Sequence, residues 1–257
     1  MKVTEYIPTE QLTPFVKSYR IIESSGDVIN RVLPGTSLAI AFRFKGQISY
    51  INNTAKIALP AATLSGLRKS VRLINYAPET AALVVLFKES GISAFIKHPV
   101  HELFEKSVSL ECFFPKSEIS TIEERLAEAG DHETRVSLMD QFLCSKLLDS
   151  KPDRIVTEAI SRIYLSKGMI RMTDLAGSLF ISQDALEKRF RKATGTTPKQ
   201  FSFIVRVGTI TRQSPASSSF LDMALDFGYY DQPHFNKDFR IFTGLTPTEF
   251  FKSASYW

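Results

Sequence analysis

One stretch organises the C-terminal half of the chain, and it reads ALDFGYYDQPHFNKDFR from Ala224 to Arg240. Phe235 and Phe239 are four residues apart, which places them on one face of a helix. Gly228 precedes this helix, and glycine suits the tight turn expected there. The opposite face then carries Gln232, Pro233, Asn236, Lys237 and Arg240. The stretch therefore predicts a short helix, a turn and a longer helix whose outer face is open to a partner.

The same pattern occurs earlier in the chain, so the C-terminal half contains an internal repeat. Leu186, Phe190 and Arg191 stand 49 residues before Phe235, Phe239 and Arg240. Each copy ends in a Gly-x-Thr-Pro motif, at residues 195–198 and 244–247. Further upstream the offset is 48, so the second copy has one extra residue in its turn. Two such copies in tandem predict two helix-turn-helix motifs.

The repeat also indicates which side chains meet a nucleic acid. In a helix-turn-helix the N-terminal part of the second helix reaches base edges in the major groove. We assign base reading to Asp184, Glu187 and Lys188 in the first copy and to Gln232, Pro233, Asn236 and Lys237 in the second. Gln and Asn suit adenine, Lys suits guanine, and Glu can accept from cytosine. Flanking residues position the helices on phosphates, and here we expect Ser182, Arg191, Thr197, Arg240 and Thr246.

Residues 153–252 resemble the DNA-binding domain of AraC/XylS-type bacterial transcription regulators. The residues that carry the resemblance are Asp174-Leu175-Ala176, Ile181-Ser182, Leu186-x-x-x-Phe190 and the two Gly-x-Thr-Pro motifs with the stretch 224–240. The resemblance implies a seven-helix domain whose two recognition helices enter successive major-groove segments on one face of the duplex. Asp184 and Glu187 depart from the family, in which neutral or basic residues are commoner at these positions.

The charge distribution supports a division of the chain into two domains. Residues 1–150 contain 17 Lys and Arg and 17 Asp and Glu, whereas residues 151–257 contain 15 against 10. A neutral half joined to a basic half is typical of a sensing or assembly module attached to a polyanion binder. We place a regulatory domain at 1–150 and the DNA-binding domain at 151–257. Within the latter, the helix-turn-helix motifs fall at about 173–195 and 219–244, joined by a helix at about 199–212.

The regulatory domain is expected to be β-rich to about residue 90 and helical from about 91 to 150. Short apolar runs separated by turn residues predict strands, at 16–23, 38–44, 47–51, 57–64, 71–75 and 80–87. Apolar residues at helical spacing predict helices at 117–129 and 133–148. The chain is therefore of the α+β class. Tyr6-x-Pro8 and the run 31–35 resemble an uncharacterised N-terminal domain of some AraC-like regulators, which implies a cupin-like barrel that senses a ligand, dimerises, or both.

The remaining features favour a regulator over an enzyme. Pro99 disrupts a regular face between His98 and His101, so we expect no metal. The sequence contains no Gly-rich phosphate loop, Ser nucleophile elbow or paired catalytic carboxylate motif, so we expect no other cofactor and no catalytic residues. Cys112 and Cys144 have apolar neighbours in the sequence, and we expect them to be inert thiols in the core. The expected partners are double-stranded DNA, a small-molecule effector, a second copy of the chain and RNA polymerase, but no membrane. We expect the protein in the cytoplasm, associated with the nucleoid.

Two alternatives remain open from the sequence. One is a cupin-like enzyme with a nucleic-acid-binding tail. The other is a constitutive regulator whose N-terminal domain only dimerises.

Overall fold

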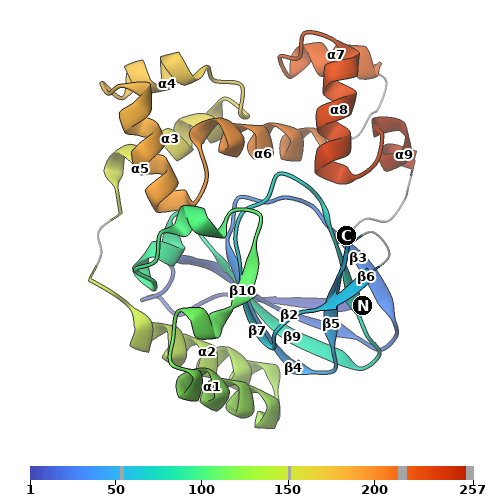
Figure 1. Cartoon of the computed structure of the whole chain (residues 1–257), viewed down its shortest axis with the longest axis vertical. Helices are drawn as coiled ribbons and strands as arrows, with labels where there is room; N and C mark the ends of the chain where they lie inside the picture. The colour runs from blue at the N-terminus through green and yellow to red at the C-terminus, as the bar shows by residue number, and fades with distance from the viewer. Residues whose placement is uncertain (53–54, 150–151, 214–218, 253–257) are drawn as a thin grey trace. The chain divides into compact units, whose positions relative to one another are not determined.

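The computed structural model describes residues 1–52, 55–149, 152–213 and 219–252 (Figure 1). The chain separates into two compact units. The N-terminal unit comprises Met1–Asn30, Ser37–Leu67 and Leu73–Pro152. The C-terminal unit comprises Asp153–Trp257 together with two short segments, Arg31–Thr36 and Arg68–Arg72. Each unit is described by itself below.

The N-terminal unit is built on two β-sheets. The six-stranded sheet has the order β1 (Lys2–Tyr6), β2 (Val16–Ser24), β9 (Thr80–Phe87), β4 (Ala39–Lys45), β7 (Ala62–Ser65) and β10 (Ser107–Ser109). The four-stranded sheet has the order β3 (Val28–Val32), β8 (Arg72–Tyr76), β5 (Ile48–Asn52) and β6 (Ala55–Ala58). The strand pairs β1–β2, β2–β9, β9–β4, β4–β7 and β7–β10 are antiparallel.

The centre of the six-stranded sheet supplies much of the core. Tyr19 of β2 lies opposite Val85 of β9, and Phe42 of β4 lies opposite Leu83. All four side chains are buried. The run Thr80–Phe87 is apolar almost throughout because β9 lies between two strands and is covered on both faces.

Three short 3-10 helices and two α-helices complete this unit. The 3-10 helices are Gly91–Ala94, Val100–Leu103 and Leu110–Cys112, and the α-helices are α1 (Lys116–Glu128) and α2 (His132–Lys146). Helix α1 buries Ile119, Ile122 and Leu126 against β4 and α2. Asp131 is the N-cap of helix α2, and its carboxylate accepts a hydrogen bond from the backbone N–H of Thr134 at 2.7 Å.

Several expectations for this unit need correction. The run 57–64 is not one strand but two, β6 and β7, which lie in different sheets and are separated by Pro60. Strands β1 and β3 were not expected. The two cysteines are not in the core, because Cys112 is exposed and Cys144 is half-buried. The six-stranded sheet takes its last strand from residues 107–109, so β structure continues past residue 90, where helices were expected to begin.

The C-terminal unit is helical. Its helices are α3 (Arg154–Leu165), α4 (Met172–Ser178), α5 (Gln183–Thr194), α6 (Pro198–Ile210), α7 (Phe220–Asp226), α8 (Gln232–Thr243) and α9 (Pro247–Lys252). The described part of residues 153–257 thus holds the seven helices that the resemblance implied, and α1 and α2 raise the number to nine across the described ranges. With the two sheets, this confirms the α+β class. Thr173 precedes an acidic residue and resembles an N-cap in the sequence, but the N-cap of α4 is Arg171, two residues earlier.

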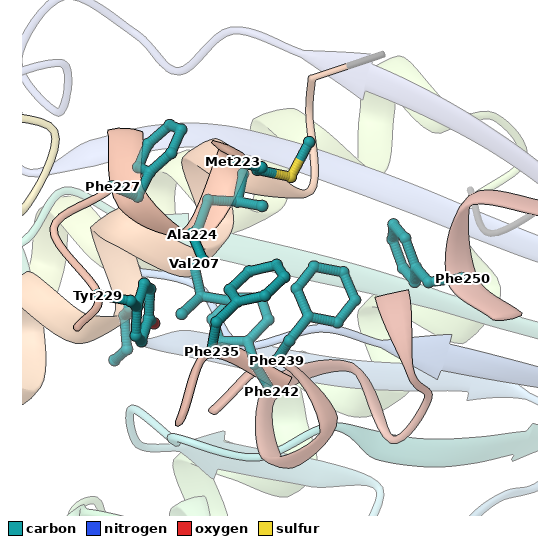
Figure 2. Close-up of a cluster of buried hydrophobic side chains, with 11 residues drawn as sticks. Val207, Met223, Ala224, Phe227, Tyr229, Phe235, Phe239, Phe242 and Phe250 are labelled. Atoms are coloured by element: carbon teal, nitrogen blue, oxygen red, sulfur yellow. The ribbon is translucent and has the colours of Figure 1, made fainter. Parts of the chain in front are cut away.

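Each copy of the repeat has its own core. Helices α3, α4, α5 and α6 pack together in the first copy, and α6, α7, α8 and α9 in the second. Phe190 of α5 meets Phe201 of α6, with ring centroids 5.4 Å apart. Figure 2 shows the cluster of the second copy, in which Phe235, Phe239 and Phe242 of α8 are buried with Phe250 of α9. Helix α6 is therefore shared and fixes one copy relative to the other.

None of the helices in the described ranges is both long and apolar enough to cross a membrane.

Candidate nucleic-acid interface

Helix α5 is fixed at both ends by its own sequence. The Ser182 hydroxyl oxygen accepts a hydrogen bond from the backbone N–H of Ala185 at 3.2 Å, which is an N-cap. Gly195 ends the helix with a φ of 80°, a backbone conformation that favours glycine. Leu186, Phe190 and Thr194 are buried. This burial turns the opposite face outward, and the exposed side chains there are Gln183, Asp184, Glu187, Lys188 and Arg191.

Helix α8 is fixed in the same way. The Asp231 carboxylate accepts from the backbone N–H of His234 at 2.8 Å, and Gly244 ends the helix with a φ of 78°. Phe235, Phe239, Phe242 and Thr243 are buried. The exposed side chains on the other face are Pro233, His234, Lys237 and Arg240, whereas Gln232 and Asn236 are half-buried.

The two outer faces share three residues at equivalent positions. Gln183, Lys188 and Arg191 of α5 correspond to Gln232, Lys237 and Arg240 of α8. Figure 1 shows α5 and α8 at the two ends of α6, each below the short helix of its own copy. An amide, an ammonium and a guanidinium repeated in this order suit base edges and phosphates.

The structure separates the base-reading candidates by accessibility. Asp184, Glu187, Lys188, Pro233 and Lys237 are exposed. Asn236 is half-buried, and its side-chain oxygen is buried with no hydrogen-bond partner among the described residues. An Asn that reads adenine must present both its oxygen and its nitrogen, so Asn236 reaches a base only if its side chain turns outward.

The carboxylates of the first copy are partly compensated. Glu187 lies 3.7 Å from Arg191, one helical turn along α5. Both side chains are about half exposed, so the pair contributes little to stability. It does place a cation beside the carboxylate on the outer face.

Two of the expected phosphate-binding hydroxyls have a structural role. Thr197 caps α6 and forms a capping box with Gln200. Thr246 accepts from the backbone N–H of Glu249 at 3.3 Å and donates to the Glu249 carboxylate at 2.8 Å. The hydrogen bonds from the backbone N–H and hydroxyl of Thr246 lower the pKa of Glu249. These hydroxyls hold helix ends in place, whereas Ser182, Arg191 and Arg240 have exposed side chains.

Sequence reasoning missed the groups that hold α8 in position. Arg206 of α6 lies 3.9 Å from the Asp238 carboxylate of α8, and its guanidinium carbon lies 4.5 Å from the centre of the Tyr229 ring. Tyr229 is buried, which raises the pKa of its hydroxyl. The available signal in the sequence was Arg206, a charged residue within the apolar run of α6.

The equivalent position of the first copy has the opposite charge. Arg189 stands where Asp238 stands, and it lies 2.8 Å from Asp153, the N-cap of α3. Each recognition helix is thus paired with the helix that precedes its own helix-turn-helix. His234, exposed one turn before Asp238, is a further outward residue that was not among the candidates.

Comparisons with known proteins agree with this geometry. Residues 175–253 match the family described as "Helix-turn-helix domain", and residues 4–109 match the family described as "Domain of unknown function (DUF6597)". No curated protein sequence matches the chain.

Three solved structures show weaker likeness. The crystal structure of ToxT from Vibrio cholerae is 14% identical, with 91% of this chain and 96% of that chain covered and a TM-score of 0.46. Wild-type ToxT from Vibrio cholerae with an unsaturated fatty acid bound is 14% identical, with 92% and 95% covered and a TM-score of 0.44. The AraC-like transcriptional activator CuxR is 10% identical, with 84% and 88% covered and a TM-score of 0.29. Because these TM-scores are low, the interpretation of residues 153–252 as a DNA-binding domain rests on the helix-turn-helix match and on the two tandem copies.

Proposed function

We propose that this chain, a DNA-binding transcription regulator with an AraC-type helix-turn-helix domain, reads duplex DNA with both α5 and α8. The observation that carries the proposal is the repeated Gln, Lys and Arg on the outer faces of two helices joined by one shared helix. A domain of this kind fits successive major-groove segments on one face of the duplex, because those segments recur about every 34 Å.

The proposed division of labour follows the chemistry of each side chain. Lys237 and Lys188 suit guanine, Gln232 suits adenine, and Glu187 can accept from cytosine. Asp184, Pro233 and Asn236 complete the base-reading set. Arg191, Arg240 and Ser182 position the helices on phosphates, and Thr197 and Thr246 support them by capping the helices that follow.

The second copy is proposed to dominate binding. Two carboxylates, Asp184 and Glu187, lie on the outer face of α5, where each approaches the negative backbone of DNA. The outer face of α8 has no carboxylate among its exposed residues Pro233, His234, Lys237, Arg240 and Ile241. Only Lys188, Arg191 and their basic neighbours offset the repulsion in the first copy.

The proposed DNA-binding domain spans residues 151–257 and the proposed regulatory domain spans residues 1–150. We assign to the latter the binding of a small-molecule effector and the formation of a homodimer. A groove of about 510 Å³ lies beside α2 and is lined by Tyr6, Thr9, Gln11, Val136, Asp140 and Cys144. This volume falls in the range of about 300–1,000 Å³ that small-molecule sites have.

Asp140, which lines this groove, accepts two hydrogen bonds. The Tyr19 hydroxyl donates to the Asp140 carboxylate at 2.5 Å, and both residues are buried. The backbone N–H of Thr9 donates to the same oxygen at 3.4 Å. A thermal-shift screen with metabolites tests the effector, and a screen that is negative throughout would favour a constitutive regulator.

We also propose that the protein has no enzymatic activity. As a DNA-binding regulator it works at the nucleoid in the cytoplasm, and it contacts RNA polymerase when it activates transcription. The competing hypothesis is a cupin-like enzyme with a nucleic-acid-binding tail. Metal analysis of purified protein distinguishes the two, because a cupin-like metalloenzyme would retain its metal.

The experiment that tests the proposal is selection of bound sequences from random duplex DNA by the full-length chain. We expect one enriched motif whose affinity falls steeply with salt, with a slope of roughly −0.9 per phosphate contact. A Lys188→Ala/Lys237→Ala double variant is the matched control and should enrich nothing. Failure of the wild-type chain to enrich any sequence at low salt would refute the proposed function.

A further inference from the structure

The turn of the first helix-turn-helix contains an aromatic residue in an unfavourable backbone conformation. Phe180 has a φ of 56°, in the left-handed region that bulky residues rarely adopt. Its backbone N–H donates to Gly177 at 3.1 Å, and the next N–H, that of Ile181, donates to Ala176 at 3.2 Å. These two bonds close the C-terminus of α4 and require the left-handed residue at position 180.

In the second copy, the equivalent left-handed position is occupied by a glycine. Gly228 has a φ of 73°, and Tyr229 donates to Ala224 at 2.9 Å just as Ile181 donates to Ala176. Glycine adopts this conformation without steric cost, whereas phenylalanine does not. The first turn is therefore less stable than it would be with the residue that the second turn contains.

Phe180 gains no packing in exchange. Its side chain is 95% exposed, the most exposed large apolar side chain in the described part of the chain. A residue that is both strained and unpacked stabilises nothing within the domain. Strain of this kind is found where a side chain has a function outside the fold.

The second turn also presents an aromatic side chain. Tyr230 is 92% exposed and is the residue by which the second turn is longer than the first. It directly precedes Asp231, the N-cap of α8, as Phe180 closely precedes Ser182, the N-cap of α5. Each turn thus places one fully exposed ring at the N-terminal end of a recognition helix.

We propose that Phe180 and Tyr230 contact the sugar-phosphate backbone at the edges of the two major-groove segments. This inference rests on the proposed function. The N-terminal end of a recognition helix enters the groove while the preceding helix crosses the backbone, so the turn between them faces a backbone strand. Phe180 packs on deoxyribose, and the Tyr230 hydroxyl donates a hydrogen bond to a phosphate oxygen.

The decisive variant is Phe180→Gly in the full-length chain, because stability and binding are expected to change in opposite directions. Thermal unfolding should show a midpoint raised by about 2–4 °C, since the strain at φ 56° is removed. Affinity for the duplex enriched by the wild-type chain should nevertheless fall, roughly five-fold or more. Because the variant is the more stable protein, this loss cannot come from unfolding.

Tyr230→Phe and Leu165→Ala complete the set. Tyr230→Phe keeps the ring and removes the hydroxyl, and it should weaken binding roughly three-fold or more. Leu165 is an exposed apolar residue, 81% accessible, at the end of α3 and outside both turns. Its alanine variant should bind as the wild type does. Each of the variants Phe180→Gly and Tyr230→Phe should lower the affinity for the enriched duplex and for a scrambled duplex by the same factor, because backbone contacts do not depend on sequence.

Each outcome is informative. A Phe180→Gly chain that is stabilised and binds DNA as tightly as the wild type would overturn the proposal while leaving the proposed function intact. A loss confined to the enriched duplex would also overturn it, because it would indicate base reading. If the wild-type chain enriches no duplex at all, the proposed function fails, and this inference with it.

Discussion

The two helix-turn-helix copies have the same backbone plan but distribute charge and aromatic packing differently. Helix α5 carries four cations and two carboxylates, whereas α8 carries two cations and one carboxylate, Asp238, which lies near Arg206. The second copy instead has the denser aromatic core, in which Phe239 meets three other rings. In the first copy, Phe190 meets only Phe201 among the described ring pairs.

The difference teaches that a repeated scaffold need not imply a repeated role. The equivalent Gln, Lys and Arg residues keep a common reading surface on both helices. Around it, the second copy presents a face with fewer charges, backed by a denser aromatic core. The following predictions test this contrast, from the largest expected effect to the smallest.

Removing one core ring from each copy should show which copy depends more on aromatic packing. Phe239→Ala should destabilise the C-terminal unit by about 3–5 kcal/mol, and Phe190→Ala by an amount near the lower end of this range. Both side chains are fully buried, but Phe239 contacts Phe235, Phe250 and Phe251. Urea unfolding of the full-length variants measures the two losses. A larger loss for Phe190→Ala would contradict the contrast.

Removing the equivalent lysine from each outer face tests which copy dominates DNA binding. Lys237→Ala should cost about 1–3 kcal/mol of specific binding free energy. Lys188→Ala should cost less, because Asp184 and Glu187 already weaken the first copy's approach to DNA. Equilibrium titrations on the enriched duplex give both values, and equal losses would refute the dominance of the second copy.

The ion pairs behind the two recognition helices should differ in strength. Asp238→Ala leaves the half-buried Arg206 without its carboxylate and should destabilise the unit by about 1–3 kcal/mol. Arg189→Ala breaks a more exposed pair with Asp153 and should cost less than about 1 kcal/mol. Thermal unfolding at low and high salt distinguishes the two ion pairs. The destabilisation caused by Arg189→Ala should shrink strongly at high salt, whereas that caused by Asp238→Ala should change little. The reverse pattern would show that the pair at Arg206 is the dispensable one.

The smallest effects concern two glycines with opposite requirements. Gly208 lies inside α6, and an added Cβ would meet only the Phe242 ring, at an ordinary 3.7 Å. Gly208→Ala should therefore stabilise the shared helix by about 1 kcal/mol. Gly195→Ala should destabilise by a similar amount, about 1 kcal/mol, because Gly195 has a φ of 80°. Differential scanning calorimetry of the pair checks the signs, and destabilisation by Gly208→Ala would show that α6 needs flexibility at this point.

The sequence predicted the helices of the repeat well because their signals are local. Helix α5 spans Gln183–Thr194, inside the motif predicted at about 173–195, since Ser182 and Gly195 mark its ends and Leu186 and Phe190 mark its inner face. The base-reading face of α8 follows from the same spacing. The half-burial of Asn236 does not, because it depends on neighbouring elements and not on its own helix.

Elements that depend on distant partners were harder to predict. Strand β1, Lys2–Tyr6, mixes charged and apolar residues because it lies at the edge of its sheet, with β2 as its partner. Strand β10 has three residues and exists only by pairing with β7. The contact between Arg206 and Asp238 likewise joins two helices whose packing no local pattern specifies.

The most direct test of the central claim, that both α5 and α8 enter the major groove, is methylation interference on the enriched duplex with the full-length chain. Guanine N7 lies in the major groove, so a methyl group there blocks a recognition helix. The account predicts two clusters of interfering guanines on one face of the duplex, about 10–10.5 base pairs apart from centre to centre. A single cluster would contradict it and would show that only one of the two copies reads DNA.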